Sequence, residues 1–161
     1  MTTTLTNSFE DERTFRDISF KWTIAWDKKD ISTFLAIAAP EIVADYSELL
    51  VDGTATRAEP EAWFKRAFQH DQIGHPDLKT QHLLGACMFT RISETEARGD
   101  WQARAFHTRT HKDGHEAQWD VSSFVEHTYL KVDGVWKFGG WRPNTITANV
   151  GKFDDVVGLV K

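Results

Sequence analysis

Residues 101–127 read WQARAFHTRTHKDGHEAQWDVSSFVEH, and the pattern of this stretch decides the fold. Apolar and polar side chains alternate on both sides of Asp113-Gly114, which is the period of a β-strand. Asp and Gly both tolerate positive φ, so the dipeptide favours a tight hairpin turn. The stretch therefore predicts two long antiparallel strands, over 96–111 and 116–131, joined by a hairpin.

The same pattern continues in both directions from this hairpin. A second Asp-Gly pair, Asp133-Gly134, predicts another turn and a strand over 135–147. A further alternating segment, over 77–91, precedes the first hairpin strand. Four long strands in succession, joined by short turns, predict an antiparallel sheet.

Upstream of the sheet the apolar period becomes that of a helix. Five apolar residues three or four positions apart mark one face of an amphipathic helix over 9–28: Phe15, Ile18, Trp22, Ala25 and Trp26. Shorter helices are predicted over 30–38, with Pro40 as its stop, and over 61–70, and a short strand over 41–47. The last segment, 151–161, is predicted to form a short helix.

Helices followed by four long antiparallel strands make an α+β chain. We expect N-terminal helices packed on a strongly bent, mainly antiparallel sheet that forms a cone-shaped pocket. The 161 residues fit one domain, predicted over 9–161, after a polar and flexible tail at 1–8. The segment 150–161 is expected to act as a C-terminal lid.

Charge and cysteine content exclude several classes of function. The formal net charge is −5 and no basic run exceeds Lys28-Lys29, so binding to a nucleic-acid backbone is not supported. The single cysteine, Cys87, can form neither an intramolecular disulfide nor a cysteine-based zinc site. The sequence lacks a secretory signal and an apolar run of membrane-spanning length, so we expect a cytoplasmic protein without a membrane partner.

The aromatic content is unusual, with 7 Trp and 11 Phe against 2 Tyr. Trp brings a large apolar ring and one N–H donor but no acceptor. Such rings fill a core or line a pocket for a flat ligand, and the core is the commoner place. By position we expect Trp22, Trp63 and Trp136 in the packing, and Trp26 and Trp101 in a pocket.

A metal site is not expected. His107, His111 and His115 recur every four residues, like metal ligands on one helical face. The alternating pattern predicts a strand here, however, and His111 and His115 would flank an exposed hairpin turn. We therefore expect neither a metal nor another cofactor.

Two histidines are better placed for catalysis. His82 shares a predicted strand face with Leu84 and Met88, and on the next strand His107 shares a face with Trp101. A histidine on an apolar face is more often a hydrogen-bonded core residue than a catalyst. Two of them on neighbouring strands, however, would reach a ligand from the same wall.

Asp27, at the end of the first predicted helix, is the candidate partner. The helix dipole disfavours a carboxylate there, so Asp27 is either a solvated member of the charged run 27–30 or a functional group. In the functional interpretation, Asp27 accepts a hydrogen bond from His107 and orients it as a base. With a phenol from Tyr46 and a hydroxyl from Ser123, this set favours proton transfer, while no G-x-S-x-G motif supports acyl-enzyme chemistry.

Several motifs around these residues resemble those of the scytalone dehydratase family, fungal polyketide and melanin-pathway enzymes with the cystatin-like cone fold of nuclear transport factor 2. The resemblance runs from about Phe15 to Pro143. Its specific stretches are Trp26-Asp27-Lys28-Lys29-Asp30, Ala39-Pro40, Asp45-Tyr46, Thr80-Gln81-His82, Gln102-x-Arg104-x-x-His107-x-Arg109 and Asp133-Gly134-Val135-Trp136-Lys137-Phe138. The resemblance implies a catalytic Asp27–His107 pair, a second active-site histidine at His82, a water-holding tyrosine at Tyr46 and a pocket serine at Ser123. It also implies a homotrimer built through the sheet face.

Two positions depart from the family pattern. Trp26 stands where the family has a second tyrosine, and Val125 stands where it has a pocket asparagine. An indole can donate but not accept a hydrogen bond, and valine can do neither, so the pocket should be more apolar and the substrate should differ from scytalone. We expect the substrate-binding residues to be Trp26, Val125, Trp101, Met88, Phe153 and Val157.

The function implied is that of a cofactor-independent lyase that removes water from a hydroxylated cyclic ketone, a small aromatic or polyketide-like molecule. His107, oriented by Asp27, would remove a proton α to the ketone, and Tyr46 would stabilise the enolate oxygen. His82 and Ser123 would hold the departing hydroxyl. An isomerase, a cyclase or a decarboxylase with the same enolate chemistry remains an alternative, as does a non-catalytic small-molecule-binding protein of this fold.

Overall fold

The computed structural model describes residues 6–50, 53–69 and 72–157. In chain order its elements are α1 (Phe9–Asp27), α2 (Ile31–Ile37), β1 (Ala38–Asp45), β2 (Ala55–Ala58), α3 (Pro60–Ala67), β3 (Leu78–Arg91), β4 (Glu96–Thr110), β5 (Glu116–Val132), β6 (Val135–Gly151) and α4 (Phe153–Val157). Within the described ranges, six strands form one sheet in the order β2-β1-β6-β5-β4-β3. Only the β1–β6 pairing is parallel in this sheet; the other neighbours are antiparallel.

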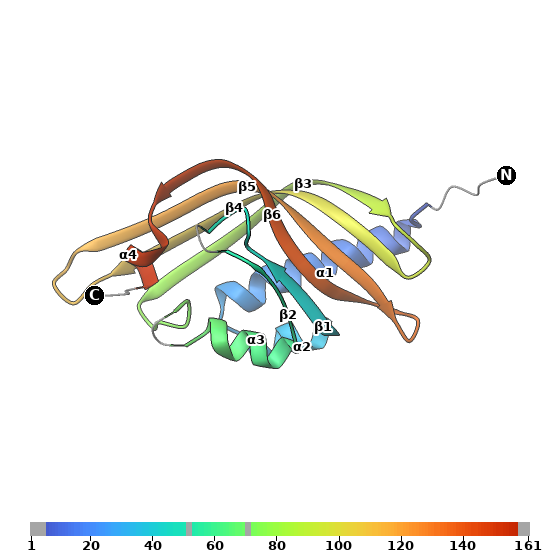
Figure 1. The fold of residues 1–161 in the computed structure, drawn as a ribbon, viewed down its shortest axis with the longest axis horizontal. Helices are drawn as coiled ribbons and strands as arrows, with labels where there is room; N and C mark the ends of the chain where they lie inside the picture. The colour runs from blue at the N-terminus through green and yellow to red at the C-terminus, as the bar shows by residue number, and fades with distance from the viewer. Residues whose placement is uncertain (1–5, 51–52, 70–71, 158–161) are drawn as a thin grey trace.

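The sheet is curled, and the helices lie on its inner side. In Figure 1 the long strands β3 to β6 arch over α1, while α2, α3, β1 and β2 lie below the arch. The sheet does not close into a barrel, because β2 and β3 remain as its two edges. This arrangement confirms the predicted α+β class and the strongly bent, mainly antiparallel sheet.

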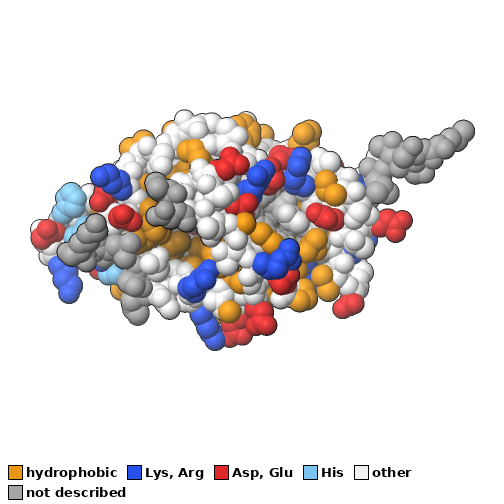
Figure 2. Space-filling view, viewed as in Figure 1, with side chains coloured by type: hydrophobic (Ala, Val, Ile, Leu, Met, Phe, Trp, Pro, Cys, Tyr) orange, Lys and Arg blue, Asp and Glu red, His pale blue; other side chains and the backbone are white. Residues whose placement is uncertain are grey.

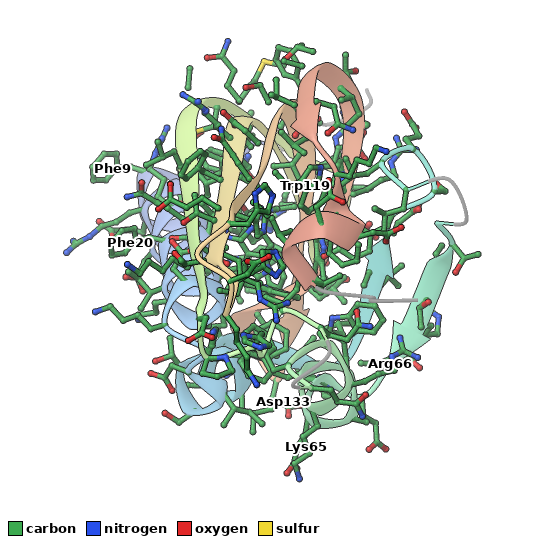
Figure 3. All side chains as sticks on the ribbon, turned by 90° about the vertical axis from the view of Figure 1, so that its left-hand side faces the viewer. Phe9, Phe20, Lys65, Arg66, Trp119 and Asp133 are labelled. Carbon is green, nitrogen blue, oxygen red and sulfur yellow. The ribbon has the colours of Figure 1, made fainter. Side chains whose placement is uncertain are left out.

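Helix α1 forms where the apolar period predicted it. Ser8 caps its first turn, because the Ser8 hydroxyl accepts from the Asp11 N–H and the Asp11 carboxylate accepts from the Ser8 N–H. The predicted stripe is the buried face, and Phe15 is fully buried against Tyr129 at a ring distance of 4.4 Å. On the opposite face, Phe20 is 62% exposed and projects outward (Figure 3). Residues 1–5 of the expected tail lie outside the described residues.

The end of α1 is fixed by an unusual backbone turn. Lys29 has φ 55°, a left-handed conformation that is uncommon for a residue with a side chain. Its ammonium group donates to the carbonyls of His75 (2.6 Å) and Leu78 (3.0 Å), at the entry to β3. Asp30 then caps α2 by accepting from the Thr33 N–H. The last residues of α1 are thereby held beside the edge strand β3.

The short elements differ most from expectation. The helix expected over 30–38 is α2, which ends at Ile37, so Pro40 is not its stop but lies inside β1, where the register with β6 shifts. The edge strand β2 has only four residues and no apolar alternation, so the sequence carries no signal for it. Strand β6 extends to Gly151, four residues beyond the expected end.

Strand β3 contains an irregularity that changes which side chains point inward. Its register with β4 shifts between Leu84 and Cys87, as in a β-bulge. Phe89 therefore packs against the core, whereas Met88 is 67% exposed. The prediction that Met88 lies on the pocket face with His82 is wrong, because strict alternation does not continue through the shift.

A buried polar network lies between α1 and β5. The Ser19 hydroxyl contacts His127 Nδ1 (2.8 Å) and the Tyr129 phenol (2.7 Å), and the Trp101 indole N–H donates to the same phenol (3.1 Å). Trp101 is only 5% exposed and belongs to this core rather than to the cavity described below. The prediction of a pocket role for Trp101 is wrong, because its ring fills the space under α1.

Acid should destabilise the fold through His127. Burial, together with the charge of nearby His82, lowers the pKa of His127 to about 3 from the ordinary 6.5. Between these pH values the unfolded chain binds a proton that the folded chain does not, so the free energy of unfolding falls as the pH drops below about 6.5. At pH 5 this single residue should remove about 2 kcal/mol of the stability present at neutral pH.

Urea unfolding of the parent chain and of His127→Asn at pH 7 and pH 5 measures this effect. The variant should lose less stability between the two pH values than the parent, and His115→Asn, at an exposed turn, should behave like the parent. An unchanged pH dependence in His127→Asn would contradict the assignment.

Candidate active site

A cavity of about 540 Å³ lies between the concave side of the sheet and the helices. This volume suits a small one- or two-ring molecule. In Figure 2 hydrophobic side chains are visible in a hollow between the regions of α4 and α3. The predicted site residues on its wall are Trp26, Tyr46, His82, His107, Ser123, Val125 and Phe153.

The Asp27 carboxylate accepts hydrogen bonds from both the ring and the backbone of His82. The His82 ring Nδ1 lies 2.7 Å from Asp27 Oδ1, and the His82 backbone N–H is 3.0 Å from both carboxylate oxygens. Because a carboxylate only accepts, His82 Nδ1 carries the hydrogen of this bond, so that in the neutral form of the ring the acceptor is Nε2. Asp27 therefore fixes both the orientation and the tautomer of His82.

This geometry corrects the expected pairing of Asp27 with His107. Strand β3 is the edge strand next to the end of α1, whereas His107 lies on β4, opposite Thr80 and two positions along from His82. Among the described residues, His107 Nδ1 has the Trp119 carbonyl as its hydrogen-bond partner, at 3.3 Å. The Asp27 carboxylate, which the sequence analysis assigned to His107, is therefore hydrogen-bonded to His82 instead.

His107 is held as a neutral ring close to this dyad. It is 3% exposed, and its ring lies 5.8 Å from the His82 ring at an interplanar angle of 87°. Burial, followed by the charge of His82, lowers the pKa of His107 to about 3. Since the Trp119 carbonyl accepts from Nδ1–H, the acceptor nitrogen of His107 is Nε2. The two imidazoles therefore present acceptor nitrogens from the same wall.

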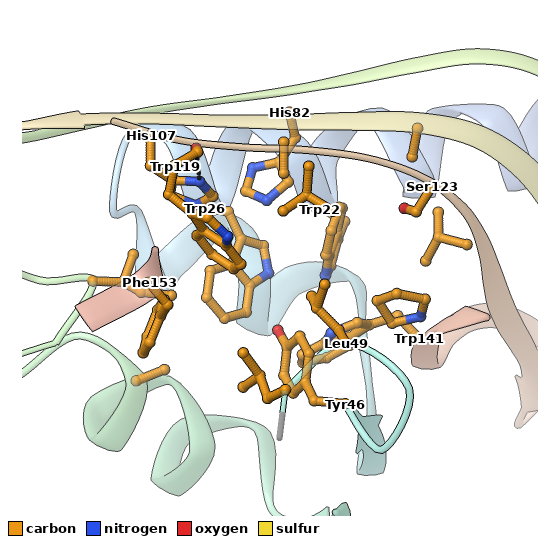
Figure 4. A pocket seen from close by; sticks show the side chains of 18 of the residues that line it. Trp22, Trp26, Tyr46, Leu49, His82, His107, Trp119, Ser123, Trp141 and Phe153 are labelled. Atoms are coloured by element: carbon orange, nitrogen blue, oxygen red, sulfur yellow. Dashed lines mark hydrogen bonds between the residues drawn. The ribbon is translucent and has the colours of Figure 1, made fainter. Parts of the chain in front are cut away.

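Tyr46 faces the histidines from the opposite side of the cavity. It directly follows β1, and its ring lies 6.4 Å from that of Trp63 and 6.0 Å from that of Trp141. In Figure 4 the Tyr46 hydroxyl points up into the space below His82 and His107. Burial raises the pKa of Tyr46 above its ordinary value, so the phenol stays protonated and able to donate.

The two positions that depart from the family pattern both face this cavity. Trp26 is 2% exposed and Val125 is 4% exposed. Ser123, two residues before Val125 on β5, is paired with Ala103 of β4. Compared with the tyrosine and asparagine that the resemblance implies at these positions, an indole and an isopropyl group offer the cavity no hydrogen-bond acceptor.

The C-terminal segment contributes one ring to the cavity. Phe153, the first residue of α4, stands edge-on to Trp119 at a ring distance of 5.1 Å. Val157 is 1% exposed and packs behind this wall, in the cluster that also contains Leu78 and Trp119, so the prediction that it lines the pocket is wrong. The reason is helical geometry, because Val157 lies on the same face of α4 as Phe153 but about one turn, roughly 6 Å, further along the helix axis. Residues 158–161 of the expected lid lie outside the described residues.

Several cavity residues were not predicted from the sequence. Trp22 and Trp63, expected only as packing residues, line the cavity together with Trp119 and Trp141. Trp136 does pack in the core, where it meets Phe15 edge-on at 5.0 Å. A signal for Trp119 was available, because the turn at Asp113-Gly114 places it directly opposite His107.

The described residues form neither a metal-binding cluster nor a helix that could span a membrane. Among the described residues, no group of three or more His, Cys, Asp and Glu side chains could hold a metal ion. No helix in the described part of the chain is long and apolar enough to cross a membrane.

The chain is similar in sequence to known proteins over nearly its whole length. The family model for scytalone dehydratase matches residues 6–160. The chain is 35% identical to scytalone dehydratase arp1 of Aspergillus fumigatus, over 98% of this chain and 94% of that protein. It is 32% identical to a scytalone dehydratase of Colletotrichum orbiculare, over 84% of this chain and 73% of that protein.

The fold also matches solved structures at low sequence identity. The Kfla4162 protein from Kribbella flavida superposes with a TM-score of 0.72 at 15% identity, covering 89% of this chain and 95% of that one. The sequence match along nearly the whole chain, together with the shared fold, decides the classification. The chain belongs to the scytalone dehydratase family.

Proposed function

We propose that the protein is a cofactor-independent dehydratase that removes water from a hydroxylated cyclic ketone of polyketide type. The observation that carries the proposal is the Asp27–His82 hydrogen bond at the wall of a cavity whose other polar groups are His107, Tyr46 and Ser123. The names of the relatives, which are scytalone dehydratases, support elimination of water as the reaction. The departures at Trp26 and Val125 favour a substrate other than scytalone.

In this mechanism His82 is the general base. Its Nε2 accepts the proton from the carbon α to the ketone, and Asp27 stabilises the imidazolium that forms. The electron pair of the broken C–H bond enters the ketone, which becomes an enolate. His107 is a weaker candidate for the base, because its lowered pKa makes its protonated form unfavourable.

The remaining groups act on the two oxygens of the substrate. The Tyr46 phenol donates a hydrogen bond to the enolate oxygen as negative charge develops there. The neutral His107 and the Ser123 hydroxyl bind the substrate hydroxyl that leaves. When the enolate re-forms the ketone, the C–O bond breaks, and the leaving hydroxide takes the proton from the His82 imidazolium, so that water departs and the dyad is restored.

The mass of the product tests this proposal against its alternatives. With a 3-hydroxy cyclic ketone as substrate, dehydration gives a conjugated enone that is lighter by one water. Isomerisation leaves the mass unchanged, decarboxylation removes carbon dioxide, and a binding protein gives no product. Loss of water that depends on the enzyme is the expected result, and any of the other outcomes with all hydroxy-ketones tried would overturn the proposal.

The homotrimer implied by the family resemblance stays a prediction, and a measurement of the molar mass of the protein in solution tests it.

A further inference from the structure

The seven indole N–H groups divide into two sets. Three of them have a partner within the protein: Trp101 donates to the Tyr129 phenol (3.1 Å), Trp119 to the Asn149 side-chain oxygen (2.8 Å) and Trp136 to the Asp11 carboxylate (2.7 Å). Trp22, Trp26 and Trp63, in contrast, have no hydrogen-bond partner for Nε1 among the described residues. Trp141 Nε1, on β6, also has no hydrogen-bond partner among these residues, although its ring lies 6.0 Å from that of Tyr46.

The unpartnered donors are gathered at one place. Trp22, Trp26 and Trp63 are 5%, 2% and 9% exposed, and all three line the 540 Å³ cavity. Trp22 and Trp26, both labelled in Figure 4, come from α1, and Trp63 comes from α3, so two separate elements contribute indoles to the wall of the same cavity. A buried donor without an acceptor is costly, and natural interiors contain few of them. Their concentration in the cavity points to a bound molecule that supplies the acceptors.

The chemistry of the indole restricts that molecule. An indole N–H only donates and does not titrate, whereas the imidazole Nε2 atoms of His82 and His107 accept. The two imidazole acceptors therefore lie on the sheet wall, whereas three of the four unpartnered indole donors come from α1 and α3. A ligand oxygen that faces the indoles is best matched when it carries no hydrogen of its own, as in a ketone or an aryl ether.

We propose that the ligand is a flat cyclic ketone with a second, acceptor-only oxygen, a carbonyl or an aryl ether, directed at the indoles of Trp22, Trp26 and Trp63. The inference rests on the proposed function for its ketone and its hydroxyl, and it adds the second oxygen. The cavity would thereby discriminate between ketones of equal size, because a ligand with this oxygen gains hydrogen bonds from the indoles, whereas a ligand without it meets only an apolar surface and unpaired donors.

Binding of two matched probes tests the inference. 6-Methoxy-1-tetralone and 6-ethyl-1-tetralone have nearly the same shape, but only the first has an ether oxygen. Titration calorimetry with the full chain should give about fivefold tighter binding of the methoxy compound, the scale of one neutral hydrogen bond. An apolar cavity without available donors would instead favour the ethyl compound.

Four variants identify the donors. Trp22→Phe, Trp26→Phe and Trp63→Phe keep an aromatic ring but remove the N–H, and at least one should reduce the methoxy preference to about onefold, with ethyl binding little changed. Trp136→Phe is the matched control and should keep the preference, because its N–H is bound to Asp11 outside the cavity. Thermal melting followed by circular dichroism confirms that each variant is folded.

The outcomes separate this inference from the proposed function. Equal binding of the two probes by the parent chain, or a methoxy preference that survives all three cavity variants, would overturn the inference. Neither result depends on turnover. A clear methoxy preference together with no loss of water from any hydroxy-ketone would instead refute the dehydratase proposal and leave the recognition of the acceptor oxygen standing.

Discussion

Asp27→Asn lowers kcat for dehydration by about 10²-fold or more, the scale on which general-base catalysis depends. Asparagine is close in size to aspartate, but it has no negative charge to stabilise the His82 imidazolium. The asparagine amide can also donate a hydrogen bond to His82 Nδ1, which in the parent chain is itself the donor. The tautomer of His82 is then no longer fixed. Steady-state kinetics on a hydroxy-ketone that the parent converts measures the loss, which should appear in kcat more than in KM.

The control for this variant lies three residues away. Asp30→Asn makes the same change of charge, but Asp30 caps α2, a position where asparagine serves equally well. It should keep kcat within about twofold of the parent, since a good cap is retained. The double variant Asp27→Asn/His82→Gln should lose no more activity than the worse single one, because the two residues act as a unit. Near-full turnover by Asp27→Asn would refute the assignment of the dyad.

Gly140→Ala destabilises the fold by more than about 3 kcal/mol, since it combines backbone strain with a steric clash. Gly140 has φ 150°, a conformation that side-chain-bearing residues rarely adopt. A Cβ at this position would lie 2.2 Å from the Val43 carbonyl oxygen, and that oxygen belongs to the backbone of β1 and cannot move aside. The clash therefore separates β1 from β6, the parallel contact that joins the short strands to the long ones.

Urea unfolding with Gly85→Ala as control measures the effect of Gly140→Ala. A Cβ at Gly85 would meet its nearest atom, the Gln102 carbonyl oxygen, at 3.5 Å, an ordinary contact. We expect this control to change the free energy of unfolding by less than about 1 kcal/mol. A Gly140→Ala chain as stable as the control would show that β1 and β6 can separate at little cost. Because Trp141 follows Gly140, a folded variant with an altered cavity would also be detected by its probe affinities.

The sequence predicts the sheet well because one turn fixes much of it. With Asp113-Gly114 at the tip, antiparallel pairing places His107 opposite Trp119, Ala103 opposite Ser123 and Trp101 opposite Val125. Regular alternation then assigns each side chain to a face. These are local rules, and they hold wherever the strand is regular.

The sequence does not predict the partner of Asp27, because that contact depends on how α1 packs on the sheet. The end of α1 is directed by the left-handed backbone of Lys29 and by the bonds of its ammonium group to the entry of β3. Neither feature follows from apolar periodicity. The resemblance correctly brings Asp27, His82 and His107 into one region, but the assignment of the carboxylate to a histidine requires the three-dimensional arrangement.

The shift of register between Leu84 and Cys87 in β3 limits how this chain can change its length during evolution. One strand serves two interiors, with His82 at the cavity and Phe89 in the core beneath α1, and the irregularity between them lets both residues point inward. A single inserted or deleted residue there would turn one of the two halves outward. Length differences among homologues should therefore occur at the exposed hairpin around Asp113-Gly114, while this part of β3 keeps a constant number of residues.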